Sequence, residues 1–221
     1  MPETIPHATL KAKQRALRVD FPETMGLRVH RSISWIGRAE QVGDDHDAAF
    51  LFLWIAFNAA YADEGSLQGI ATGERGAFEG FFAKLVALDA DQQIYNAIWK
   101  QFSGPIRNLM QNRYVFNPFW QFHNGVDGFD DWEERFNASA RSFAQAVQST
   151  DTTRVLSFVF DRLYILRNQL IHGGATWNSA VNRAQVGDSA AILGFLMPVF
   201  IDIMMDNPDE DWGQPFYPVV D

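Results

Sequence analysis

The chain has 221 residues, of which 47% are hydrophobic and 20% charged, a composition typical of a globular protein that buries its own core. It contains no cysteine, which excludes disulfides, thiolate metal sites and a cysteine nucleophile. The N-terminal segment lacks the apolar stretch of a secretory signal, and no run of about 18 apolar residues predicts a transmembrane helix. We therefore expect a cytoplasmic protein without membrane contact.

The net charge of −9 is unevenly distributed along the chain. Residues 184–221 contain seven acids and neither lysine nor arginine, whereas residues 1–31 carry six cations against three acids. Residues 141–183 carry five arginines against two aspartates. A uniformly acidic surface repels nucleic acid, so any RNA contact should come from the two basic regions. The acidic tail suggests solubility or, alternatively, a cover for a basic site.

Prolines interrupt residues 1–22, which we expect to form an irregular or weakly helical arm. A helix should follow and continue to about Gln41, because apolar residues recur at three- and four-residue spacing. Aspartates then provide N-caps for a helix ending near Ala62 that is apolar almost all round, which predicts a central position in the core. Residues 63–76 form a glycine-rich loop without the lysine and hydroxyl residue of a phosphate-binding loop.

The middle of the chain predicts two short helices, one over residues 77–88 and one ending near Phe102. Asp89 or Asp91 should cap the second, and residues 103–105 (Ser-Gly-Pro) should break it. Residues 105–129 then interleave six aromatics with cations. Such a segment could stack bases and hold phosphates, or it could pack across the bundle as a lid on the core.

Two further helices are expected over residues 132–148 and from Asp151 or Thr152 to His172, followed by a polar loop over residues 175–187. A final helix over residues 189–205 contains Pro198, which predicts a kink. No strand pattern is visible, so we predict an all-α bundle. It comprises the arm (1–22), one helical domain (23–205) and an acidic tail (206–221).

Residues 167–174 (Arg-Asn-Gln-Leu-Ile-His-Gly-Gly) end the longest apolar helical run. At about 100° per residue, Asn168 and His172 share a polar stripe with Arg154 and Asp161, whereas Arg167 projects towards the apolar side. Arg167 and His172 point about 140° apart, so they could act together only at a distorted helix end or across two chains. The alternative is structural, because a Gly-Gly step commonly ends a helix and histidine complements its dipole.

The octet resembles the Arg-(Asn/Asp/His)-x-x-x-His signature of the HEPN superfamily (higher eukaryotes and prokaryotes nucleotide-binding domain). Two upstream stretches, residues 27–41 and 49–62, are similar to a bacterial branch of it, and the resemblance spans roughly residues 25–175. It implies a HEPN-like helical bundle, with additional N- and C-terminal helices, that usually dimerises. Many such domains are metal-independent endoribonucleases of toxin–antitoxin, phage-defence or CRISPR systems.

Carried over to this chain, the resemblance assigns the catalytic arginine to Arg167, the polar position to Asn168 and the catalytic histidine to His172. Histidine can move protons near neutral pH, and arginine can hold a scissile phosphate. One toxin branch has a tyrosine two residues after the histidine, where this chain has Gly174, so that form of control is not expected. Further RNA contacts are predicted at the following residues: Arg154, Arg162, Arg113, Trp120 and His123.

The predicted function is RNA cleavage by a homodimer, without metal or cofactor, with an antitoxin or a defence-system protein as a possible partner. Two alternatives remain open. One is a non-catalytic HEPN module that binds a nucleotide, RNA or a protein partner. The other is a plain helical scaffold in which the octet is only a helix end.

Overall fold

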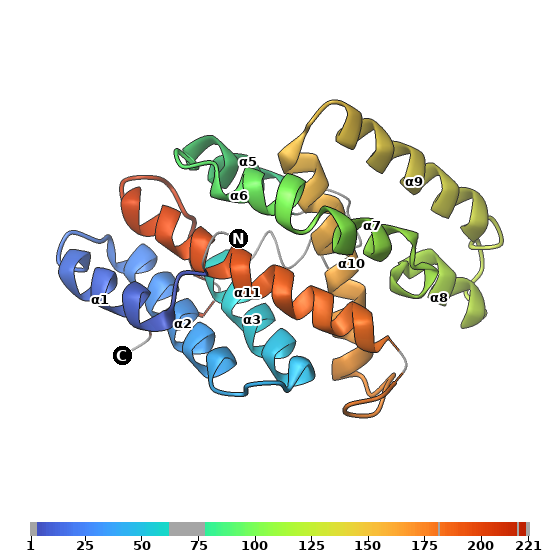
Figure 1. Ribbon diagram of the computed structural model, residues 1–221, viewed down its shortest axis with the longest axis horizontal. Coiled ribbons are helices and arrows are strands. Elements are labelled where there is room, and N and C mark those ends of the chain that lie inside the picture. Colours follow the sequence, from blue (N-terminus) through green and yellow to red (C-terminus); the bar gives the residue numbers. More distant parts are fainter. Residues whose placement is uncertain (1–3, 62–77, 181, 216, 220–221) are drawn as a thin grey trace.

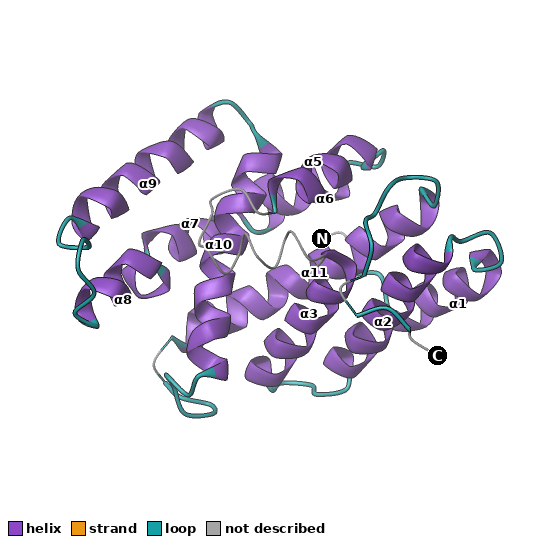
Figure 2. Cartoon of the chain, turned by 180° about the vertical axis from the view of Figure 1, so that it is seen from behind, coloured by secondary structure: helices purple, strands orange, loops and turns teal. Residues whose placement is uncertain are grey.

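The computed structural model describes residues 4–61, 78–180, 182–215 and 217–219, and within them it is all-helical, without a strand (Figures 1 and 2). The elements are α1 (His7–Leu17), α2 (Glu23–Glu40), α3 (His46–Tyr61), α5 (Glu79–Leu88), α6 (Gln93–Asn96), the π-helix η1 (Ala97–Gln101), α7 (Ser103–Gln111), the 3-10 helix η2 (Arg113–Val115), α8 (Asn117–His123), α9 (Trp132–Gln148), α10 (Thr152–Ile171) and α11 (Arg183–Asp206). The all-α prediction is therefore confirmed.

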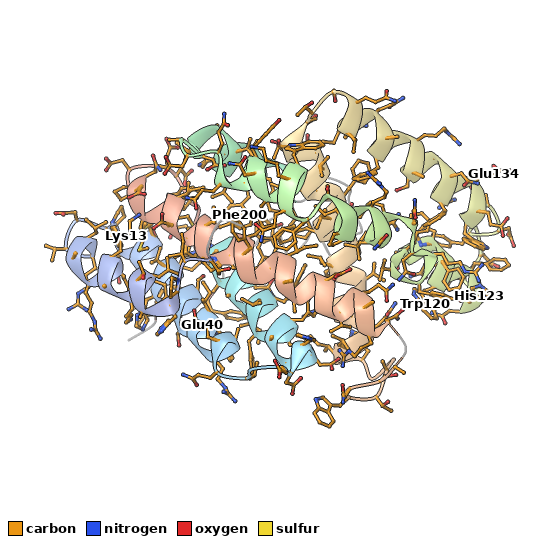
Figure 3. All side chains as sticks on the ribbon, in the orientation of Figure 1. Lys13, Glu40, Trp120, His123, Glu134 and Phe200 are labelled. Atoms are coloured by element: carbon orange, nitrogen blue, oxygen red, sulfur yellow. The ribbon has the colours of Figure 1, made fainter. Side chains whose placement is uncertain are left out.

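The core is organised around α3 and α11, which pack against each other and against α2 (Figure 1). Aromatic rings fill the space between these helices, α5 and α10. The ring of Phe160 lies 4.5 Å from that of Phe57 and 4.7 Å from that of Phe82, and Phe200 joins them near the centre of Figure 3. Such tilted pairs add specific geometry to the burial of large apolar surface.

α11 is the one described helix that is long and apolar enough to cross a membrane, with a mean hydropathy of 1.7. However, 72% of its apolar stretch is buried inside the bundle. A core helix surrounded by others needs this composition, because it has no solvent face. The bundle therefore accounts for the apolar character of α11.

α8 and α9 lie beside α10 at one end of the molecule (Figure 1). We refer to this pair of helices as the arm, as distinct from the N-terminal segment of residues 1–22. It has a small apolar cluster of its own, made by Phe116, Phe119 and Trp132. The segment of residues 105–129 divides between two neighbourhoods. α7 packs against α10 and α11 and contributes Ile106, Leu109 and Met110 to the main core, whereas α8 packs against α9.

The C-terminal tail is attached to the other end of α3, opposite the octet. The buried Arg28 donates hydrogen bonds to the carbonyls of Ala60, Gly213 and Gln214 at 2.9, 3.2 and 2.7 Å. Trp212 is buried, with its ring 6.1 Å from that of Phe81. The described part of the tail is held by its backbone and by Trp212, and its contacts lie away from the octet.

Three stretches differ from the prediction. The N-terminal segment, expected to be irregular or weakly helical, contains the regular helix α1, which begins directly after Pro6 and docks on α11 through Lys13, whose Nζ lies 2.6 Å from a carboxylate oxygen of Asp202. The helix before residues 103–105 ends at Gln101, as predicted, but the same three residues also start α7, because proline is tolerated in the first turn of a helix. The loop predicted over residues 175–187 ends early, since α11 begins at Arg183.

Other boundaries agree with the sequence. Asp89 does cap the following helix, accepting from the backbone N–H groups of Gln93 and Ile94. Asp151 caps α10 by accepting from the backbone of Arg154. The glycine-rich loop predicted over residues 63–76 lies outside the described residues.

Candidate active site at the end of α10

α10 ends in a complete Schellman motif. The backbone N–H of Gly173 donates to the carbonyl of Leu170 at 3.4 Å, and that of Gly174 donates to the carbonyl of Gln169 at 2.7 Å. Gly173 has φ +71°, a left-handed conformation that glycine adopts without strain. A Cβ at Gly174 would lie 3.1 Å from the Gln169 oxygen. Both glycines therefore have a structural explanation.

Arg167 is held in place from within the octet. Its Nη1 donates to Oδ1 of Asn168 at 2.9 Å, and its buried Nε has no hydrogen-bond partner. Arg167 follows Tyr164 by one turn, and the Tyr164 ring packs 6.2 Å from that of Trp54 on α3. The guanidinium thus lies half-buried beside the core, where a cation is costly unless it is paired or used.

His172 is the C-cap residue of α10, with φ −90° and ψ 11°, and its side chain is exposed. Its backbone N–H donates to the carbonyl of Asn168 at 3.0 Å. Within the part of the chain that the structure describes, its imidazole makes no hydrogen bond. Both ring nitrogens are therefore free to meet a ligand from solvent.

The structure brings Arg167 and Asn168 together but leaves His172 apart from them. The helix remains regular to Ile171, so five residues separate Arg167 and His172 by about 140° around the axis and by about 7.5 Å along it. The side-chain Oδ1 of Asn168 faces Arg167, so in this conformation Asn168 positions the arginine instead of the histidine. A helix end distorted enough to unite the two residues is absent here.

The loop that follows the octet is fastened to the start of α3. Trp177 donates through Nε1 to Oδ2 of Asp45 at 3.0 Å. Asp47 accepts from the backbone of Asn178 at 3.3 Å and from Nη1 of Arg183 at 2.6 Å. The hydrogen bond from the backbone N–H of Ala48, reinforced by Trp177, lowers the pKa of Asp45. The two aspartates thereby fix one side of the candidate site.

Two large apolar side chains are exposed in this region, one within the octet and one in the loop that follows it. Ile171 is 50% exposed and Trp177 is 73% exposed. Single exposed apolar residues are common, but these two flank His172 in the sequence on either side. Ile171 in the octet and Trp177 in the loop that follows it thus leave apolar surface open to solvent.

Of the residues predicted to contact RNA, Trp120 is joined to the octet, because its Nε1 and the side-chain amide of Gln169 both donate to the Tyr114 carbonyl. Arg154 is exposed in the first turn of α10, about 20 Å along the axis from Arg167. Arg162 must be removed from the set, because it is only 4% exposed. Its Nη1 and Nη2 donate to the Val115 carbonyl and the Ser139 hydroxyl, both at 3.3 Å. Its guanidinium carbon also lies 4.5 Å from the centre of the Phe116 ring and 5.5 Å from that of Phe136, so Arg162 is a buried structural cation.

Arg113, Trp120 and His123 do lie together, on η2 and α8, at the outer end of the arm (Figure 3). Arg113 and His123 line a pocket there that also contains the carboxylates of Asp130, Asp131, Glu133 and Glu134, all exposed. Negative charge at this density repels phosphate. Sequence reasoning treated the acids at residues 130–131 only as helix caps, although their density already indicated an acidic surface.

Within the described ranges, no three histidine, aspartate or glutamate side chains are grouped so that they could hold a metal ion. Comparisons of the chain with protein-family models, with curated proteins and with solved structures find no match. The candidate site therefore has to be judged from its own residues.

Proposed function

We propose that this protein is a cytoplasmic, HEPN-type endoribonuclease whose site is built from Arg167, Asn168 and His172. One observation supports the proposal above the others. A half-buried guanidinium is oriented by the neighbouring amide and keeps an unsatisfied Nε, and the same helix end carries a histidine whose ring has no partner among the described residues. A helix stop alone needs neither group.

The chemistry follows from the properties of the side chains. His172 would accept the proton of a ribose 2′-hydroxyl, whose oxygen attacks the adjacent phosphorus while the 5′-oxygen leaves and takes up a proton. Arg167 would hold the phosphate and balance the charge that develops on its oxygens. Asn168 would keep the guanidinium aimed at the phosphate.

The site requires a second copy of the chain. Arg167 and His172 diverge on a regular helix, whereas a two-fold axis beside the helix end can set the arginine of one protomer against the histidine of its partner. The exposed side chains of Ile171 and Trp177 provide apolar surface for that contact. A toxin or defence role with a protein partner remains part of the proposal, carried by the resemblance of the octet.

The decisive experiment is cleavage of a mixed RNA substrate by the purified protein in the presence of EDTA. Wild-type protein should cleave, and His172→Ala and Arg167→Ala should each lower the rate at least 100-fold, typical for loss of a catalytic group. His30→Ala on α2 and Arg141→Ala on α9 are matched controls, because both residues are exposed and remote. Activity retained by His172→Ala would refute the assignment.

Complementation tests the two-chain site directly. An equimolar mixture of Arg167→Ala and His172→Ala protomers forms heterodimers with one intact composite site each, which should recover about a quarter of the wild-type activity. If each site lies within one chain, every site in the mixture lacks one residue and no activity returns.

A second candidate is a non-catalytic HEPN module that binds a nucleotide, RNA or a protein. The separation of His172 from Arg167 within one chain favours it, as does the net charge of −9. In that case wild-type protein cleaves no RNA, and His172→Ala changes at most the affinity for a ligand.

A further inference from the structure

A pocket of about 690 Å³ opens between α8 and the start of α9, at the outer end of the arm. Figure 3 shows His123 and Trp120 of α8 at this end, with Glu134 of α9 nearby. The volume lies within the range of about 300–1,000 Å³ that ligand sites commonly have. The pocket shares no residue with the octet, although the backbone carbonyl of Tyr114, one of its lining residues, accepts a hydrogen bond from Gln169 of the octet.

Aromatic rings form its walls, and packing holds them in place. Phe119 and Trp132 are only 6% and 9% exposed, and their rings meet edge to face at 5.1 Å. Tyr114 lies edge to face with Phe119 at 5.4 Å and is 42% exposed, while Phe122 is 38% exposed. The pocket therefore offers accessible ring surfaces on a rigid base, so that a ligand need not order them.

Four carboxylates surround these rings: Asp130, Asp131, Glu133 and Glu134. Of these four acids, only Asp131 forms an ion pair with another described residue, and its carboxylate lies 2.7 Å from Nε of Arg135. Acids in the first turn stabilise a helix, but the Asp131 side chain makes no capping hydrogen bond. The negative charge beside the pocket thus exceeds what the local structure uses.

Arg113 shows which chemistry the walls accept. Its guanidinium carbon lies 5.2 Å from the centre of the Tyr114 ring and 5.8 Å from that of Phe119, which are cation–π distances. Among the described residues it has no ion pair with any carboxylate. One internal cation therefore rests on the rings while four acids line the same pocket, which leaves the pocket strongly negative.

We propose that this pocket binds an arginine- or lysine-rich segment of a partner protein. Aromatic faces and carboxylates together favour organic cations over anions or neutral groups. The acids extend from Asp130, before α9, to Glu134 in its first turn, and the pocket is too large for one side chain. A segment with several cationic side chains matches both features. The inference does not depend on the ribonuclease proposal.

The test is the binding of a fluorescein-labelled tetra-arginine peptide to the full-length protein, followed by fluorescence anisotropy. Removing two charges with Glu133→Gln and Glu134→Gln together should weaken binding about tenfold, and Phe122→Ala about fivefold, as expected for two partly exposed ion pairs and a cation–π contact. Asp20→Asn with Glu23→Gln, at the start of α2, makes the same change in net charge and should alter affinity less than about twofold.

Arg113→Ala gives an outcome that a purely structural role would not produce. Vacating the rings should raise the affinity for the peptide severalfold, more than Arg141→Ala, which removes the same charge from an exposed position on α9. Equal weakening by the α2 control would overturn the proposal, as would competition by spermine at the same concentration as the peptide. Binding of an RNA oligonucleotide that Arg113→Ala abolishes would assign the pocket to nucleic acid instead.

Discussion

Replacing Gly173 by alanine isolates the part of the octet that serves the fold. No atom lies within 4 Å of the Cβ that this change would add, so the cost comes from the backbone alone. Holding a non-glycine residue at φ +71° costs roughly 1–2 kcal/mol. The lower entropy of the unfolded alanine chain offsets about 0.4–1 kcal/mol of this cost. The strain is the larger contribution, so we expect a net loss of about 1 kcal/mol.

Urea unfolding followed by circular dichroism measures this difference in the free energy of unfolding. In thermal unfolding, a protein of this size should lose about 2–4 °C in Tm. Gly173→Asn should lose less, because asparagine tolerates the left-handed region better. Gly80→Ala is the matched control. It lies in the first turn of α5 with no atom within 4 Å of the added Cβ, so it should be neutral or stabilising by up to about 1 kcal/mol. A Gly173→Ala protein as stable as wild type would refute the Schellman explanation of the helix end.

Three further changes test the scaffold, each by urea unfolding. Arg162→Leu should cost about 2–3 kcal/mol, because it leaves buried acceptors without donors, and a cost below 1 kcal/mol would contradict the core role of Arg162. Trp212→Ala should cost about 3 kcal/mol by opening a cavity beside Phe81, unless the tail is dispensable. Asp45→Ala should cost about 1 kcal/mol, the usual worth of an N-cap. Because the folded protein lowers the pKa of Asp45 below its ordinary 3.8, this advantage of the wild type is complete at neutral pH and disappears as the pH falls below about 4; a pH-independent difference would contradict the argument.

The helices that the sequence predicted well are those whose burial is periodic. Val155, Val159, Leu163 and Leu166 of α10 are all buried, as their spacing indicated. α7 was missed because the Ser-Gly-Pro triplet is compatible with both the end of one helix and the first turn of the next. The π-helix over residues 97–101 depends on packing between elements and has no sequence signal in one chain.

The candidate site was only partly predictable from the sequence. Arg162 was assigned to RNA, yet it lies three residues after Val159 and four before Leu166, so its position on the apolar face was already readable. The anchoring of the octet loop by Asp45 and Asp47 could not be foreseen, because these contacts join residues more than 130 positions apart. Periodicity puts Asn168 on the same face as His172, but its side chain bonds Arg167, because the choice of neighbour depends on a rotamer that periodicity does not specify.

Four residues of the octet have roles that the helix end, the core and the neighbouring 3-10 helix explain. Gly173 and Gly174 end the helix, and Leu170 packs against the core. Gln169 donates to the Tyr114 carbonyl and joins α10 to η2. A helix stop would work equally well with alanine or lysine at the three other polar positions, 167, 168 and 172. The chain instead places there a half-buried guanidinium, the amide that orients it and an unpartnered imidazole, at an end bordered by exposed apolar side chains. This combination stabilises a fold poorly but suits the proposed chemistry of holding a phosphate and moving a proton, in which a second protomer would bring the two groups together.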